Sequence, residues 1–154
     1  MTSCGVCRLH ADSVACARYE IGRGRTWILR QHPEPAPLQG WLQLDSRRHL
    51  GGAIDFLPEE AAAWGSSAVQ DASRLVQSLS GCERVYAIGF GEGARHLHLR
   101  LIPRFGNDPD IEAWKVADLY RMVMDGSRAP APADQVAALI QRGRDLWTDL
   151  NSLS

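Results

Sequence analysis

The sequence lacks both a strong net charge and a long hydrophobic run. Its 154 residues carry 17 basic and 18 acidic side chains, for a formal net charge of −1. No whole-chain field therefore favours nucleic acid or an anionic membrane surface. No segment reaches the 18 or more apolar residues of a membrane span, and the opening MTSCGVCRLHADS has no apolar core of a secretory signal. We therefore expect no nucleic-acid partner, no membrane partner and a cytoplasmic location.

Cysteine is scarce as well, with four residues in the chain. Thiols stay reduced in the cytoplasm, so these cysteines need a role other than disulfide bonding. Cys16 and Cys82 stand alone and are expected to be buried as small hydrophobic residues. Cys4 and Cys7 form a C-x-x-C pair, which is a candidate for metal binding or redox chemistry.

The sequence does contain the composition of a globular domain, with 45% hydrophobic and 23% charged residues. Pro58 and Gly81 favour the start and the end of one long helix. The expected strands are 18–21, 25–30, 40–45, 84–90 and 96–102, and the expected helices are 58–80, 111–124 and 133–150. We expect Pro103 to end the last strand. Short connections between the strands predict an α+β fold with an antiparallel sheet of about five strands.

The composition shifts after residue 105. We expect residues 1–105 to form the main domain with an N-terminal metal-binding segment. Residues 106–154 read as a C-terminal helical extension packed on the same domain, and a role in dimer contacts is the alternative.

The most informative stretch is RHLHLRLIPR, residues 95–104. Residues i and i+2 of a strand lie about 6.6 Å apart on one face. His96, His98 and Arg100 should therefore form a row on one face, while the intervening leucines pack into the core. A polar face turned to solvent is the plainer alternative.

A zinc site is the first interpretation of the row's opening histidine. Tetrahedral zinc needs four ligands, and C-x-x-C supplies two of them. His49 follows the strand 40–45 and His96 opens the strand 96–102, so both could reach Cys4 and Cys7. Such a site has no open position, which predicts a structural Zn2+ ion.

Two alternatives to this site stay open at the level of sequence. The C-x-x-C pair could be accidental, or it could be a redox pair, although no βαβ unit follows it. His10 and His32 are expected to be exposed loop residues, and His10 is close enough in sequence to compete as a ligand.

With the motif His96-Leu-His98-Leu-Arg100-Leu-Ile-Pro-Arg, the sequence resembles the histidine triad (HIT) superfamily of nucleotide hydrolases and transferases. Their motif is His-φ-His-φ-His-φ-φ, commonly followed by Pro-Arg. Three further segments agree in order: the C-x-x-C of the zinc-binding branch, GWLQLDSRRHL at residues 40–50 and DFLPEEAAA at residues 55–63. Gly91 lies five residues before His96, where the family has a phosphate-loop glycine.

The resemblance implies a HIT-like fold and an enzyme that acts on a nucleotide or a nucleotide conjugate. The middle histidine, His98, would attack the α-phosphate and form a covalent nucleotidyl-histidine. The loop Gly91–Gly93 would stabilise charge on the phosphoryl oxygens. The family's zinc ligands correspond to the four already proposed from spacing, and members of this type commonly form homodimers.

The sequence also departs from the family. Arg100 replaces the third histidine, which in family hydrolases contacts the scissile phosphate and the leaving group. Glu92 and Gly93 replace a polar pair of the phosphate loop, and Gln31 is the only nearby counterpart of the acidic residue that binds ribose hydroxyls. His98 and Arg100 are therefore the candidate catalytic residues, and the candidate substrate-binding residues are Gly91, Glu92, Gly93 and Gln31. Three interpretations remain: an altered hydrolase or nucleotidyltransferase, another reaction on the same scaffold, or a catalytically inactive nucleotide-binding or interaction protein.

Overall fold

A computed structural model describes residues 4–151 of the chain; the outer residues of both expected domains, 1–3 and 152–154, lie outside it. One antiparallel sheet runs through the molecule in the order β1-β2-β3-β5-β4. Its strands are β1 (Glu20–Arg23), β2 (Trp27–Gln31), β3 (Leu42–Ser46), β4 (Arg84–Ile88) and β5 (His98–Arg104). The expected α+β fold with a five-stranded antiparallel sheet is confirmed.

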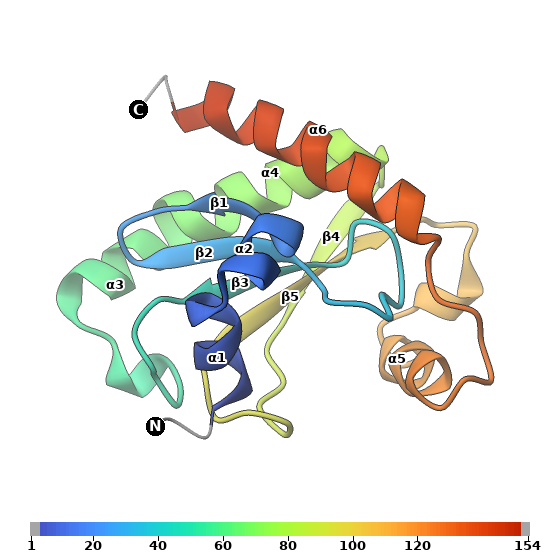
Figure 1. Cartoon of the computed structure of the whole chain (residues 1–154), viewed down its shortest axis with the longest axis horizontal. Helices are drawn as coiled ribbons and strands as arrows, with labels where there is room; N and C mark the ends of the chain where they lie inside the picture. Colours follow the sequence, from blue (N-terminus) through green and yellow to red (C-terminus); the bar gives the residue numbers. More distant parts are fainter. Residues whose placement is uncertain (1–3, 152–154) are drawn as a thin grey trace.

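One face of the sheet packs against helices and forms the main hydrophobic core. These helices are α3 (Pro58–Ala63), α4 (Val69–Ser80) and α6 (Ala133–Asn151), and Figure 1 shows α4 and α6 side by side above the sheet. Leu99 and Leu101 of β5 lie in this core with the apolar stripes of α4 and α6. The long expected helix is interrupted by one π-helical turn, Trp64–Ala68, and it ends at Gly81, where φ is +68°.

The opposite face of the sheet carries the predicted row, and described helices contact the row at both of its ends. The N-terminal helices α1 (Gly5–Ala11) and α2 (Ser13–Tyr19) lie at one end. Helix α5 (Val116–Met124) packs against Trp41 and Ile102 at the other. His98 lies in the row between His96, whose ring contacts His10 of α1, and Arg100, whose guanidinium lies over the Tyr120 ring of α5.

Three expectations about local structure were wrong. The strand expected at 18–21 begins at Glu20, because two short helices that the sequence did not predict precede it. Asp12 caps the second helix by accepting hydrogen bonds from the backbone N–H groups of Val14 and Ala15. Pro103 does not end the last strand, since β5 continues to Arg104. Pairing with β3 stops at Leu101, so the missing N–H of proline removes no bond on that side. The helix expected from residue 111 begins at residue 116, after a 3-10 turn.

No described helix is both long enough and apolar enough to cross a membrane.

Candidate active site and metal centre

The four predicted metal ligands come together. His96 Nδ1 lies 3.6 Å from Cys4 Sγ and 3.4 Å from Cys7 Sγ, and His49 Nδ1 lies 3.4 Å from Cys7 Sγ. All four ligand atoms are within 4.8 Å of one another. A tetrahedron with Zn–S bonds of about 2.3 Å and Zn–N bonds of about 2.0–2.1 Å has edges of about 3.5 Å. The cluster could therefore hold a zinc ion with little rearrangement.

Local structure positions three of the four ligands, Cys4, Cys7 and His96. Cys4 is the N-cap residue of α1, so the C-x-x-C pair occupies the first turn of a helix. The Nε2–H group of His96 donates to the Ser46 carbonyl at 2.7 Å, which leaves Nδ1 with the free electron pair that a metal needs. Burial lowers the pKa of His96 and keeps its imidazole neutral. Four protein ligands complete the coordination, so the zinc would be structural.

His98 is held in the tautomer that a nucleophile requires. Its Nδ1 lies 2.8 Å from the His96 carbonyl oxygen. A carbonyl only accepts, so Nδ1 carries the proton and Nε2 keeps its lone pair. The side chain is 7% exposed, and burial lowers its pKa, which favours the neutral form at neutral pH. The residue whose side chain faces the metal site thus also orients the candidate nucleophile through its backbone.

Arg100 has a different environment from both histidines. Its guanidinium lies 5.3 Å from the centre of the Phe90 ring and 5.1 Å from that of Tyr120. Within the described chain it has no hydrogen bond and no carboxylate partner, and its Nε is buried without an acceptor. Burial lowers the pKa of Arg100 from its ordinary value. A half-buried cation without an acceptor is suited to bind an anion.

The neighbouring strands add polar residues that the sequence analysis did not select. Asp45 pairs with His98 in the sheet register, and its fully buried carboxylate accepts from Arg30 Nε at 2.5 Å and from His10 Nε2 at 2.9 Å. Gln43 pairs with Arg100 on the same face. The alternation of apolar and polar residues at 42–45 (Leu-Gln-Leu-Asp) was the signal that could have found Gln43 and Asp45, whereas no alternation marks Arg30.

His10 and His32 are not exposed loop residues, as the sequence had suggested. His10 lies in α1 and binds Asp45, and it does not belong to the metal cluster. His32 is 8% exposed, and its Nδ1–H donates to the Pro33 carbonyl at 2.7 Å. Burial lowers the pKa of His32 to about 4. Both histidines therefore help to enclose the row face.

The four candidate substrate-binding residues are not all brought to one place. Glu92 and Gly93 line a cavity of about 420 Å³ together with Arg100, and Gly91 lies in the same loop. Gln31 is fully buried, and its amide donates to the Trp41 carbonyl. The register places Gln31 beside Leu42, on the face opposite the row. The structure therefore does not join Gln31 to the other three, and we leave it out of the proposed site.

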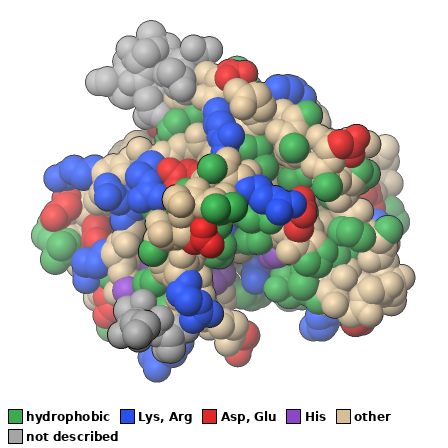
Figure 2. All heavy atoms as spheres, viewed as in Figure 1, with side chains coloured by type: hydrophobic (Ala, Val, Ile, Leu, Met, Phe, Trp, Pro, Cys, Tyr) green, Lys and Arg blue, Asp and Glu red, His purple; other side chains and the backbone are tan. Residues whose placement is uncertain are grey.

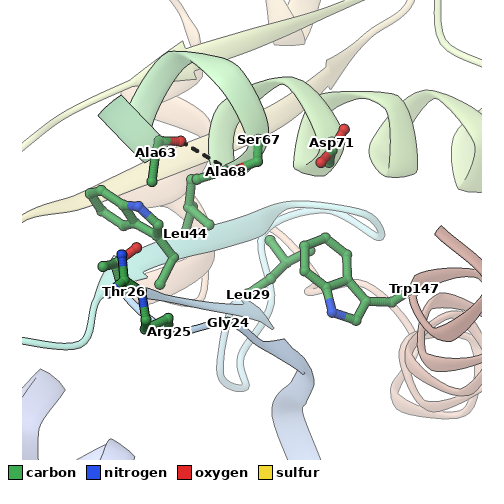
Figure 3. Close-up of a pocket in the computed structure, with 11 residues that line it drawn as sticks. Gly24, Arg25, Thr26, Leu29, Leu44, Ala63, Ser67, Ala68, Asp71 and Trp147 are labelled. Atoms are coloured by element: carbon green, nitrogen blue, oxygen red, sulfur yellow. Dashed lines mark hydrogen bonds between the residues drawn. The ribbon is translucent and has the colours of Figure 1, made fainter. Parts of the chain in front are cut away.

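The surface around the row is hollowed. Figure 2 shows purple histidine side chains and blue basic side chains in a hollow, with hydrophobic side chains on the side where α5 lies. A second cavity, of about 230 Å³, lies between the sheet and the helices that cover its other face (Figure 3). Its lining includes Leu29, Leu44, Ser67, Ala68 and Trp147 of α6. It contains no residue of the row and belongs to the packing of the helical face.

No protein-family model and no curated protein sequence matches the chain. Several solved structures do match the chain in fold. A zinc-bound histidine triad family protein from Mycobacterium smegmatis is 16% identical, with a TM-score of 0.65 over 99% of this chain and 98% of that one. A histidine triad protein from Bradyrhizobium japonicum is 19% identical, with a TM-score of 0.62 over 87% and 94%. A HIT family member from Bacillus subtilis is 14% identical, with a TM-score of 0.59 over 85% and 100%.

The chain has the histidine triad fold. The resemblance stated from the motif is thus confirmed in the architecture, and the cysteine–histidine cluster agrees with a zinc-binding form of this fold. In this histidine triad fold the row is His96, His98 and Arg100, with an arginine where the motif has its third histidine.

Proposed function

We propose that the protein is a nucleotide hydrolase or nucleotidyltransferase that acts at the α-phosphate of a nucleotide through a covalent intermediate on His98. The observation that carries this proposal is the 2.8 Å contact between His98 Nδ1 and the His96 carbonyl. It leaves Nε2 unprotonated, and a neutral imidazole nitrogen is a good nucleophile near physiological pH.

The proposed reaction has two displacements. First, the lone pair of His98 Nε2 forms a bond to the α-phosphorus, and the bond to the leaving group breaks with its electron pair. Second, the oxygen of water or of another acceptor attacks the same phosphorus, and the Nε2–P bond breaks. The acceptor loses one proton in the second step, and His98 returns to its neutral form.

Arg100 and the Gly91–Gly93 loop support the phosphoryl group in this proposal. Arg100 has no acceptor of its own in the described chain, so its N–H groups can bind phosphoryl oxygens. The glycine loop can add backbone N–H donors. Zinc, when bound to Cys4, Cys7, His49 and His96, would hold α1 against the start of β5 and would not take part in either displacement.

The nucleotide or nucleotide conjugate and a second copy of the chain are the partners that we propose with this function. Both rest on the resemblance to histidine triad proteins and on the shared fold. A sedimentation experiment on the full chain would test the homodimer, and a mass near 34 kDa, about twice the 17.0 kDa chain, is the expected result.

Intact mass is the direct test of the function. The full-length protein would be incubated with dinucleoside polyphosphates and with nucleoside phosphoramidates that carry adenine, guanine or uracil. We expect turnover with at least one of them, and a nucleotidyl adduct that His98→Ala abolishes. Neither adduct nor turnover with any substrate would contradict the proposal.

One observation favours a second candidate function. Arg100 cannot readily give up a proton, and Glu92 brings a carboxylate to the phosphate loop. A binding protein without turnover, or a scaffold used for another reaction, would show this pattern too. Nucleotide binding in calorimetry with no adduct, and a gain of hydrolysis in Arg100→His, would favour this alternative.

A further inference from the structure

The cavity next to Arg100 has walls of a specific kind. Trp41, Phe90 and Tyr120 contribute aromatic rings, and Ala117 contributes a small side chain beside them. Tyr120 and Ala117 come from α5, in the part of the chain where the sequence contains no recognisable motif. Flat rings favour a flat, unsaturated ligand, because aromatic groups pack with offset or edge-on geometry.

The charges in this cavity are largely paired. Glu92 is the one carboxylate among its lining residues, and Arg121 forms an ion pair with Asp118 of the same helix. Arg100 is the lining cation that has no carboxylate partner within the described chain, so it can compensate one negative charge on a bound group. A polyphosphate chain would bring several negative charges and would meet the carboxylate of Glu92, so the cavity is poorly suited to it.

Arg100 also limits how a leaving group can depart. A histidine at this position could protonate the departing atom, whereas a guanidinium keeps its protons at neutral pH. It can instead stabilise a departing anion with charge-assisted hydrogen bonds. His32, whose ring centroid lies 5.6 Å from that of Tyr120, is buried, and burial lowers its pKa to about 4, so it is uncharged at neutral pH. The cavity thus favours a group that leaves as an oxyanion without a proton.

We infer that the leaving group of the substrate is a flat aryl oxide, which departs into the cavity lined by Trp41, Phe90 and Tyr120, and that Tyr120 is the residue that selects it. The substrate class is then a nucleoside 5′-monophosphate aryl ester. This inference rests on the proposed function. As the Nε2–P bond forms at His98, the P–O bond to the aryl group breaks and its electron pair stays on the aryl oxygen beside Arg100. Water then releases the nucleotide, and its proton neutralises the aryl oxide, so the net products are a nucleoside monophosphate and a phenol.

Two adenosine 5′-monophosphate esters provide the test. One carries phenol, and the other carries hexafluoroisopropanol, an alcohol of similar acidity without a flat ring. We expect the full-length protein to cleave the phenyl ester with a kcat/KM about tenfold higher, because only the ring gains aromatic contacts. Tyr120→Ala should bring the ratio close to one, mainly through KM. Tyr120→Phe should keep it, since the ring is retained.

Trp114→Ala is the matched control. Trp114 is 94% exposed and does not line the cavity, so its loss should leave the ratio unchanged. Ala117→Leu is a second test should Tyr120→Ala fail to fold, because it fills the cavity from the same helix and should also abolish the preference. The inference is overturned by a wild-type ratio near one, or by an unchanged ratio in Tyr120→Ala or Ala117→Leu. A loss in Tyr120→Phe as large as in Tyr120→Ala would also overturn it, since the hydroxyl would then be the active group.

A failure of the proposed function would look different. In that case neither ester is cleaved by the wild-type protein and no adduct forms. Calorimetry with His98→Asn and the intact esters would still decide the question about the cavity. An affinity about tenfold higher for the phenyl ester supports the aryl pocket, and equal affinities contradict it.

Discussion

The two faces of β5 are both buried, but they use burial differently. Leu99 and Leu101 are 7% and 0% exposed and pack into a continuous apolar core. His96 and His98 are 2% and 7% exposed on the other face. Burial of leucine stabilises the fold by about 1.5–3 kcal/mol for each side chain, whereas burial of a polar group costs free energy unless it is hydrogen-bonded. Burial on the row face therefore depends on hydrogen-bond acceptors such as the Ser46 and His96 carbonyls, and the proposed chemistry lies on this face.

A second difference lies within the row itself. His96 uses both ring nitrogens, one toward Ser46 and one toward the cysteines. His98 uses only Nδ1, and Arg100 has no hydrogen-bond acceptor within the described residues. The number of protein partners thus falls over the five residues 96–100, from the proposed metal ligand His96, through the proposed nucleophile His98, to the proposed anion-binding residue Arg100.

Loss of the zinc cluster should have the largest effect on the fold. Structural zinc in small peptides contributes about 10–16 kcal/mol of binding energy. This protein has a core of its own, so we expect Cys4→Ser to lower the melting temperature by about 10 °C or more. Metal analysis should find about one zinc per wild-type chain and much less in the variant. Cys16→Ser, outside the cluster, is the control and should keep both the metal and the stability.

Replacement of His98 should reduce turnover strongly and thermal stability only slightly. We expect His98→Asn to reduce turnover about 1,000-fold or more, because the proposed nucleophile is lost. Its thermal stability should change little, since His98 makes one hydrogen bond and lies outside the apolar core. Activity assays and calorimetry on the same preparation would check both. Residual turnover above a tenth of wild type would show that another group attacks the phosphorus.

The sequence predicted those parts of the fold that depend on alternation and spacing. Local patterns of residues predicted the long helix, the cluster of Cys4, Cys7, His49 and His96, and the last strand. That strand was expected at 96–102 and is observed as β5 at His98–Arg104, so His96 precedes it. In the row, the alternation of polar and apolar residues is sufficient to predict which side chains lie on each face of β5.

The rest depends on contacts between distant segments. Helices α1 and α2 have seven residues each, and such short helices are held by capping and packing and leave only a weak periodic signal. The placement of Tyr120 over Arg100 depends on how α5 packs against Trp41 and Ile102. The acceptor for His98 Nδ1 is a backbone carbonyl, which no side-chain motif can reveal.

A substitution in the apolar core tests whether the two faces of β5 act independently. Leu101→Ala should lower the free energy of unfolding by about 2–5 kcal/mol, because it opens a cavity in a fully buried site. Denaturant unfolding at a fixed pH would measure it. The nucleotide chemistry of the remaining folded protein should stay within a few-fold of wild type. A loss of activity without a loss of stability would show that the two faces are coupled.

The pH dependence of stability tests whether α5 shields His32, at its end of the row, from water. Desolvation lowers the pKa of His32 to about 4, from about 6.5 when unfolded. Between these values the unfolded chain binds more protons at this residue, so its contribution to stability is complete above pH 6.5 and falls as pH falls toward 4. The expected loss is about 3 kcal/mol. His32→Gln should remove that part of the slope, and the difference between the two curves cancels the other histidines. Parallel curves would show that His32 is already hydrated in the folded state, and Tyr120 would then not seal the aromatic end of the row.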